Sequence, residues 1–234
     1  MLENLTNRLG RREWPIVLAL LIPAAALWGF VELVDEVAEG STQAVDRMLL
    51  LALRNPADTT EPLGPAWLEE MMRDFTALGG VGVLTLITLA AAGYLFMLSR
   101  PKAGLAVILA VGGGILLSTV VKMVIDRPRP DLVPHGSYVA TASFPSGHSM
   151  MAAVVYLTLA VMIARVRPRW TTKAYVLLWA VLVTLLVGIS RVYLGVHWPT
   201  DVLAGWTVGS AWALLCWLAT LWLQRKGNLE SDVG

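Results

Sequence analysis

Residues 103–125 read AGLAVILAVGGGILLSTVVKMVI, and this stretch indicates the fold class. It contains one charged residue, Lys122, and is longer than the roughly 20 residues that a helix needs to cross a bilayer core. Because backbone groups inside a bilayer must be hydrogen-bonded within the protein, we expect a membrane-spanning helix here. The three consecutive glycines at 112–114 favour close packing of a neighbouring helix.

The same pattern recurs along the 234-residue chain, which is 56% hydrophobic and 15% charged, with a mean hydropathy of +0.65. Soluble proteins carry about 25% charged residues. The apolar runs predict an all-α membrane protein with one domain and six spans, at about 14–34, 79–98, 103–125, 147–165, 174–194 and 201–223. The first run could instead be a signal peptide. It exceeds the usual apolar core of about 7–15 residues, so we expect it to be retained.

Basic residues are distributed unevenly between the two sides of this predicted bundle. One side carries eleven of the 18, namely Arg8, Arg11, Arg12, Arg100, Lys102, Arg165, Arg167, Arg169, Lys173, Arg225 and Lys226. The other side carries Arg47, Arg54, Arg73, Lys122, Arg127, Arg129 and Arg191. Cytoplasmic loops are enriched in lysine and arginine. We therefore predict a multi-pass protein of the inner or plasma membrane, with both termini cytoplasmic and the second group facing the outside or the periplasm.

The longest connection, residues 35–78, belongs to the outer side and is rich in acidic residues. Its segments 44–53 and 67–75 have an amphipathic pattern, and the segment 55–65 between them is rich in turn-forming residues. We expect two short interfacial helices here. A lid over an active site is the alternative.

Three polar clusters lie at the outer ends of predicted spans, and the first is KMVIDRPRP at residues 122–130. A charge inside the hydrocarbon region costs about 2.5–3.5 kcal/mol, so these cations need an explanation. Lys122 could reach the membrane surface and be followed by an ordinary basic turn. Alternatively, Lys122 and the arginines could bind phosphate oxygens, for which arginine has suitable bidentate geometry.

The second cluster is SFPSGHS at residues 143–149, just where a span begins. Such a sequence can simply cap a helix, but the amides of a helix N-terminus can also bind an anion. The third cluster is SRVYLGVHWPTD at residues 190–201. Four residues separate His197 from Asp201, so one helical turn would place both on one face. Asp201 could then hold a proton on one ring nitrogen and leave the other to attack an electrophile. An interfacial Trp198 with a capping aspartate is the alternative.

The predicted topology brings the three clusters to one membrane face. Together they provide cations, a nucleophile and a proton donor, which are the groups that phosphoryl transfer needs. No cluster has the histidine, cysteine and aspartate set of a zinc site, and Cys216 is the only cysteine. We therefore expect neither a metal nor another cofactor.

These clusters resemble the type 2 phosphatidic acid phosphatase superfamily, also called lipid phosphate phosphatases, whose motifs are K-x6-R-P, P-S-G-H and S-R-x5-H-x3-D. All motif positions are filled with the spacing intact. The resemblance implies that His197 forms a phosphohistidine, that Asp201 orients it and that His148 is the general acid and base. It also implies phosphate binding by Lys122, Arg129, Ser146, Gly147 and Arg191.

Two further residues fall outside the motif positions. Arg127 begins a second Arg-Pro pair that is two residues too close to Lys122, so it is only a candidate contact to a lipid headgroup. His135 matches no motif position, and we expect no role for it in the site.

The resemblance predicts metal-independent hydrolysis of a lipid phosphomonoester or pyrophosphate, such as phosphatidylglycerol phosphate, phosphatidic acid or undecaprenyl pyrophosphate. The same site could instead transfer phosphate to another lipid, or bind phospholipids without turnover in a binding or transport protein. Soluble relatives that bind vanadate and oxidise halides share similar motifs, but six predicted spans argue against that reading. The expected partners are the bilayer and its lipid substrate, with no nucleic acid and no obligate protein partner.

Overall fold

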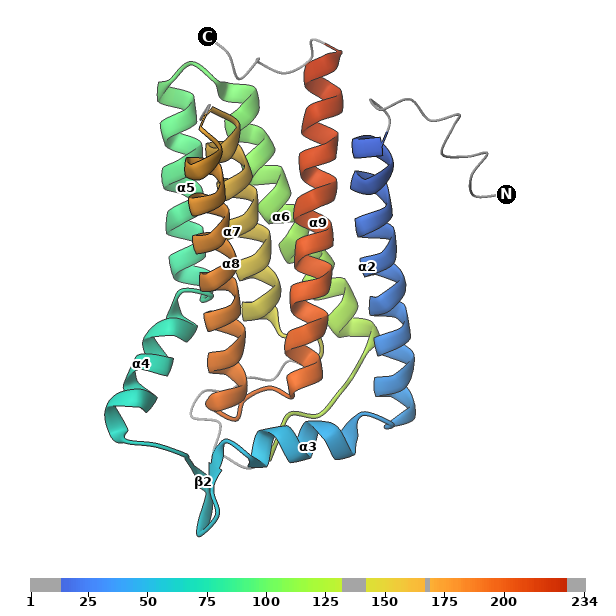
Figure 1. The fold of residues 1–234 in the computed structure, drawn as a ribbon, viewed down its shortest axis with the longest axis vertical. Helices are drawn as coiled ribbons and strands as arrows, with labels where there is room; N and C mark the ends of the chain where they lie inside the picture. The colour runs from blue at the N-terminus through green and yellow to red at the C-terminus, as the bar shows by residue number, and fades with distance from the viewer. Residues whose placement is uncertain (1–13, 132–141, 167–168, 227–234) are drawn as a thin grey trace.

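The computed structural model describes residues 14–131, 142–166 and 169–226. These residues are mostly helical, and Figure 1 shows a bundle of long helices with shorter elements at one end. The helices are α2 (Trp14–Glu39), α3 (Gln43–Leu51), α4 (Ala66–Ala77), α5 (Val81–Met97), α6 (Pro101–Val124), α7 (Gly147–Val166), α8 (Trp170–Tyr193) and α9 (Pro199–Arg225). Strands β1 (Arg54–Asn55) and β2 (Asp58–Pro62) form an antiparallel hairpin between α3 and α4.

The predicted all-α membrane fold is confirmed. In the described part of the chain, α6, α7, α8 and α9 are long and apolar enough to cross a membrane, and α4 with α5 can form a fifth span bent by 46°. Helix α2 has 26 residues and packs against α9. The total of six spans stays a prediction.

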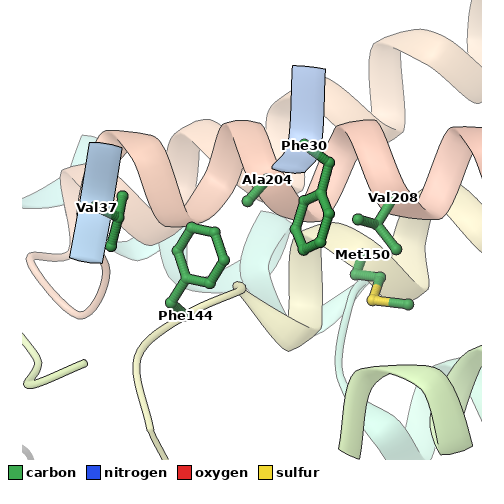
Figure 2. Packing of buried hydrophobic residues seen from close by; sticks show 6 residues of the cluster. All are labelled: Phe30, Val37, Phe144, Met150, Ala204 and Val208. Carbon is green, nitrogen blue, oxygen red and sulfur yellow. The ribbon is translucent and has the colours of Figure 1, made fainter. Parts of the chain in front are cut away.

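Helix α2 continues five residues beyond the predicted end of the first span, because its apolar positions keep the helical spacing. Phe30 and Val37 are buried, whereas Asp35 and Glu36 between them are exposed. Figure 2 shows the cluster that these two residues join, which also contains Phe144, Met150, Ala204 and Val208. A helix that packs on protein need not end where the bilayer core ends. This contact places the last turns of α2 beside the starts of α7 and α9.

Two of the three consecutive glycines at 112–114 of α6 allow the predicted close helix packing. A Cβ atom on Gly113 would lie 2.4 Å from the Trp212 ring of α9, and one on Gly114 would lie 3.1 Å from Val154 of α7. The Trp212 indole donates a 2.7 Å hydrogen bond to the carbonyl of Ala110. Gly112 has no such neighbour within 4 Å. Helix α6 is thereby held against both helices that begin at the polar end of the bundle.

The outer connection forms the two predicted helices, α3 and α4, whereas its β1–β2 hairpin was not predicted. In Figure 1, α3 and the hairpin lie at the end of the bundle opposite the start of α2 and the end of α9. Helix α3 buries Asp46 and Leu50, while Val45, Met48 and Leu49 are exposed. A fully buried carboxylate beside exposed apolar side chains indicates that α3 is anchored through a polar contact. Its placement at the membrane interface, or as a lid, stays a prediction.

Candidate active site

The three predicted clusters lie at the end of the bundle where α6 and α8 finish and α7 and α9 begin. The predicted residues occupy the last turn of α6 (Lys122), the segment after it (Arg129), the start of α7 (Ser146, Gly147, His148), the last turn of α8 (Arg191), the loop before α9 (His197) and the first turn of α9 (Asp201). His148 lies within electrostatic range of Arg191, His197, Arg129 and Lys122. The structure therefore brings the predicted catalytic and phosphate-binding side chains together.

A short turn between α8 and α9 positions His197. The turn passes through Gly195, whose φ of 71° lies in the left-handed region that glycine adopts most easily. Trp198 is the N-cap of α9, Pro199 follows it, and the carboxylate of Asp201 accepts the Trp198 backbone N–H at 2.9 Å. Asp201 therefore caps the helix with the same carboxylate that faces His197.

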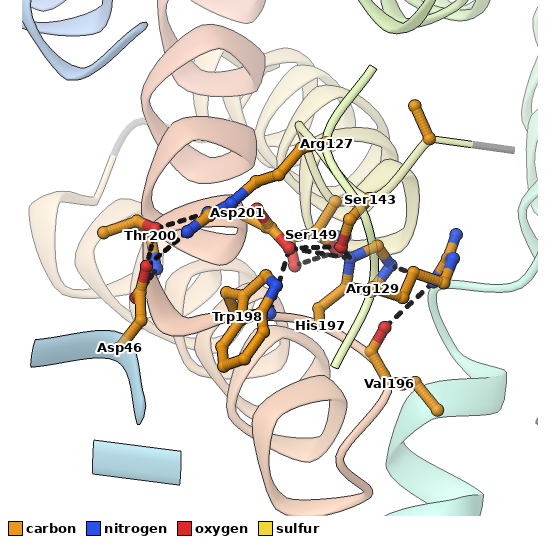
Figure 3. Close-up of polar contacts among 12 residues, drawn as sticks. Asp46, Arg127, Arg129, Ser143, Ser149, Val196, His197, Trp198, Thr200 and Asp201 are labelled. Carbon is orange, nitrogen blue, oxygen red and sulfur yellow. Dashed lines mark hydrogen bonds and ion pairs between the residues drawn. The ribbon is translucent and has the colours of Figure 1, made fainter. Parts of the chain in front are cut away.

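The contacts of His197 define which ring nitrogen carries the proton. Its Nδ1 lies 3.3 Å from Oδ2 of Asp201, and its Nε2 lies 3.1 Å from a guanidinium nitrogen of Arg129. A guanidinium can only donate hydrogen bonds, so Nε2 must accept. The proton of the neutral ring then resides on Nδ1, where Asp201 accepts it, and the lone pair of Nε2 faces a cation (Figure 3).

Ser143 is a second partner of this pair that the sequence did not single out. Its hydroxyl donates a 2.5 Å hydrogen bond to Oδ2 of Asp201, and its oxygen lies 3.3 Å from Nδ1 of His197. Because the single hydroxyl proton is used on the carboxylate, the oxygen can accept from Nδ1–H. Ser143 lies two residues before the P-S-G-H motif, and only its position beside that motif pointed to it.

His197 is buried, with 1% of its surface exposed, and its pKa is lowered to about 4. Burial is the main cause, because it disfavours the charged ring. The hydrogen bond and the charge of Asp201 act in the opposite direction, while Arg191 and Arg129 lower the pKa further. The imidazole is therefore neutral around pH 7, as a nucleophile must be.

Three cations of the predicted phosphate-binding set donate hydrogen bonds to neutral oxygens. Lys122 Nζ donates to the carbonyl of Ala142 at 2.7 Å, and Arg191 donates to the hydroxyl of Thr76 at 2.9 Å. Arg129 donates to the carbonyl of Val196 at 2.9 Å, and burial lowers its pKa. A hydrogen bond to a neutral oxygen does not cancel a positive charge, and cations gathered in one place favour the binding of an anion.

Ser146 precedes α7 and Gly147 begins it, and Ser146 already contacts other residues of the protein. Its backbone N–H donates to the carbonyl of Asp201 at 2.9 Å, and its hydroxyl oxygen accepts from Ser149 at 2.9 Å. Gly147 lies beside Lys122, whose Cε would be 3.7 Å from an added Cβ atom. Ser146 therefore links α7 to α9 in this structure, and Gly147 leaves room beside the lysine.

Arg127 does not make the predicted headgroup contact. Its guanidinium lies between two carboxylates, 2.6 Å from Asp46 and 2.7 Å from Asp201, and its side chain is 10% exposed. It also lies over the ring of Trp198, 5.7 Å from the centroid. The positive charge of Arg127 is thus paired with carboxylates inside the protein. His135 lies outside the described residues.

Comparison with known proteins identifies the family of this chain. The family model of the PAP2 superfamily matches residues 103–225. Phosphatidylglycerophosphatase B of Bacillus subtilis is 43% identical over 145 residues, which cover 61% of this chain and 70% of that protein. The undecaprenyl-diphosphatase of Sulfolobus acidocaldarius is 32% identical over 134 residues, covering 54% of this chain and 57% of the relative.

A solved structure extends the likeness over most of the fold. The crystal structure of a transmembrane PAP2-type phosphatidylglycerolphosphate phosphatase from Bacillus subtilis superposes with a TM-score of 0.74 and 34% sequence identity. The match covers 87% of this chain and 98% of that one. The resemblance drawn from the three motifs is thereby confirmed, and the chain belongs to the PAP2 superfamily as one of its multi-pass membrane lipid phosphatases.

Proposed function

We propose that this protein removes phosphate from a phosphomonoester or diphosphate headgroup of a membrane lipid through a phosphohistidine on His197. The observation that carries the proposal is the state of the His197 ring, with Nδ1–H directed at Asp201 and the lone pair of Nε2 directed at Arg129. A phosphoryl oxygen bound by Arg129 would bring its phosphorus close to that lone pair. Geometry of this kind favours direct attack by the ring.

The reaction balances with two histidines and one water molecule. In the first step, Nε2 of His197 forms a bond to phosphorus, the bond from phosphorus to the leaving oxygen breaks, and His148 gives that oxygen a proton. In the second step, His148 takes a proton from water, the hydroxide attacks phosphorus, and the P–N bond breaks. Phosphate leaves and both histidines return to their starting states.

The charged side chains have separate tasks in this scheme. Lys122, Arg129 and Arg191 stabilise the charge that develops on the phosphoryl oxygens. Gly147 lets the substrate approach the start of α7. The Ser146 hydroxyl accepts a hydrogen bond from Ser149 but still has its own proton to donate to a phosphoryl oxygen. Asp201 stabilises the positive charge that the ring acquires when Nε2 bonds to phosphorus. The site performs these steps with side chains and water, and we propose that it needs no metal.

The relatives support two kinds of lipid headgroup. One is named for phosphatidylglycerol phosphate, a phosphomonoester, and another for undecaprenyl diphosphate. We propose one membrane-embedded domain over residues 1–234, acting on phosphatidylglycerol phosphate, phosphatidic acid or undecaprenyl pyrophosphate. We further propose that the site faces the outside or the periplasm. It lies at the end of the bundle opposite Arg100, Lys102 and Lys173, which belong to loops or helix starts on the more basic side.

The first test is phosphate release by the purified protein in detergent–lipid micelles, with the three candidate lipids as substrates. His197→Ala should lower the rate by at least about 10³-fold, because the covalent step is lost. His135→Ala is the matched control, since it removes a histidine outside the motifs and should keep full activity. Wild-type activity should survive a chelator and be inhibited by vanadate.

The same preparation can be labelled to detect the intermediate. With a substrate carrying ³²P in the phosphoryl group, rapid quenching in alkali should trap a labelled protein in the wild type and none in His197→Ala. Full activity of His197→Ala, or loss of wild-type activity in the chelator, would overturn the proposal. Label that appears in a second lipid, with little free phosphate, would make the protein a phosphotransferase.

A further inference from the structure

Asp46 is a fully buried carboxylate that no motif includes. It lies on α3, 81 positions before Arg127 and 154 positions before Thr200, the two residues whose side chains or backbone it contacts. Its Oδ1 accepts the backbone N–H of Thr200 at 2.9 Å, and its Oδ2 accepts the Thr200 hydroxyl and an Arg127 nitrogen, both at 2.6 Å. Asp46 therefore binds the first turn of α9, one residue before Asp201.

Arg127 joins this carboxylate to the catalytic pair. One of its terminal nitrogens contacts Oδ2 of Asp46, and the other contacts Oδ1 of Asp201 at 2.7 Å. His197 faces the remaining oxygen of Asp201, Oδ2. Figure 3 shows the resulting line of contacts, which runs from Asp46 through Arg127 and Asp201 to the ring of His197.

The number of charges in this line matters because the ring becomes positive when Nε2 bonds to phosphorus. Arg127 and Asp201 alone would form a neutral pair, and a neutral pair stabilises a cation poorly. With Asp46 the group carries one formal negative charge, since two buried carboxylates share one guanidinium. Burial weakens screening by water, so this extra charge acts strongly on a neighbouring ring.

We propose that Asp46 is a positioning residue of the phosphatase reaction. It holds Arg127 and the start of α9 so that Asp201 keeps both its direction and its negative charge toward His197. This inference rests on the proposed role of His197 as the nucleophile. Within the described ranges, Arg129, Arg191 and His148 also lie within electrostatic range of the ring, and Arg129 contacts it at Nε2, the nitrogen that does not face Asp201.

A purely structural anchor for α3 is the alternative, and Asp46→Asn separates the two. Asparagine keeps the shape and an oxygen for the Thr200 N–H, but it removes the charge that balances Arg127. Thr42→Val is the matched control. Thr42 lies one turn earlier on the same buried side of α3, and its buried hydroxyl has no hydrogen-bond partner in the described structure. Thr42→Val thus perturbs the anchor without touching the charges.

The measurement is kcat and KM per folded enzyme with a phosphomonoester lipid in micelles. We expect Asp46→Asn to lower kcat by about 10- to 100-fold, the range seen when a partner of a site residue is removed, with KM within about twofold. Asp46→Glu should recover part of kcat, because the charge returns at a displaced position. Thr42→Val should keep wild-type kcat. Equal kcat in Asp46→Asn and Thr42→Val, or a rise in KM alone, would overturn the inference.

A second variant keeps the inference testable if Asp46→Asn does not fold. Arg127→Lys retains the positive charge, but a lysine cannot hold two carboxylates in the fixed fork of a guanidinium. We expect at least a tenfold lower kcat for this variant, and wild-type kcat would overturn the inference. Full activity in His197→Ala would instead overturn both the proposal that His197 is the nucleophile and this inference. If His197→Ala is inactive and Asp46→Asn is fully active, only the proposed role of Asp46 is overturned.

Discussion

The two sides of His197 are built in opposite ways. On the Nδ1 side, Asp201 is fully buried and paired with Arg127, whose charge Asp46 also shares. On the Nε2 side, Arg129 contacts the ring itself and the carbonyl of Val196. One side of the ring faces a carboxylate that is paired within the protein, and the other faces a cation. The first suits a group that must stay oriented, and the second suits a group that must accept an anion.

Arg127 and Arg129 illustrate this difference between the two sides of the His197 ring. They are two residues apart in the same Arg-Pro-Arg-Pro segment, yet Arg127 contacts Asp201 and Arg129 contacts Nε2 of His197. In a regular strand, residues two apart share a face, so their spacing alone would send both the same way. From these different partners we propose that Arg127 serves orientation and Arg129 serves phosphate binding.

The largest effect is expected on the orienting side, from Asp201→Asn. An asparagine amide that donates to Nδ1 would favour the ring form with its proton on Nε2, which cannot attack. We expect kcat to fall by about 10³- to 10⁴-fold, as for a histidine held in the wrong tautomer, with KM little changed. Steady-state kinetics in micelles would check this. A loss of less than tenfold would mean that Asp201 does not orient the ring.

Effects of intermediate size should distinguish Arg127 from Arg129, one in the free energy of unfolding and the other in kcat/KM. Arg127→Leu leaves Asp46 and Asp201 buried without their shared cation, which should lower the free energy of unfolding by about 3–5 kcal/mol. Arg129→Leu should affect unfolding less, but it removes a charge-stabilising donor and should lower kcat/KM by about 10²- to 10³-fold. Thermal unfolding in detergent and phosphate release would measure the two quantities.

The control for this pair is Arg73→Leu. Arg73 is exposed on α4 and pairs with Glu69 one turn away, so its loss should change unfolding by only about 0–1 kcal/mol. Equal destabilisation by Arg127→Leu and Arg129→Leu would contradict the division between the two sides.

The smallest effect concerns pH. It tests whether burial or the charge of Asp201 has the larger influence on the pKa of His197. Burial lowers the pKa of His197 to about 4 although Asp201 opposes this. The folded protein should therefore keep the ring neutral as pH falls through 6.5, the ordinary value, and protonate it only near pH 4. Ring ¹⁵N NMR of the protein in micelles, assigned by comparison with His197→Ala, would follow this change. A midpoint near 6.5 would show that the ring is hydrated or that Asp201 outweighs burial.

The features that depend on local sequence were predictable. Apolar runs predicted the long helices, because a bilayer demands about 20 residues of internally bonded backbone. The predicted order of spans, together with the distribution of basic residues, placed His148, Arg191 and His197 at one end of the bundle. Amphipathic patterns predicted α3 and α4, although the hairpin between them was missed because its strands are too short to show a period of two.

The residues that were missed are those whose partners lie far away in the chain. Asp46 reads as one more acid in an acidic loop, yet it is fully buried against Thr200 and Arg127. Ser143 reads as part of a helix cap, yet it donates to Asp201. Arg127 reads as a surplus basic residue beside a motif. No periodicity marks such contacts, because each one depends on two elements packing together.

The sequence by itself determined the membrane class, the positions of most helices and the inventory of catalytic groups, since these follow from hydropathy and from motif spacing along one chain. Only the tertiary structure decided which side of His197 each charge serves. A guanidinium bridging α3 and α9, and a serine before α7 reaching Asp201, exist only once the helices have packed. Electrostatic interactions act through space, so the partners of a charge are set by the fold and not by its neighbours in sequence.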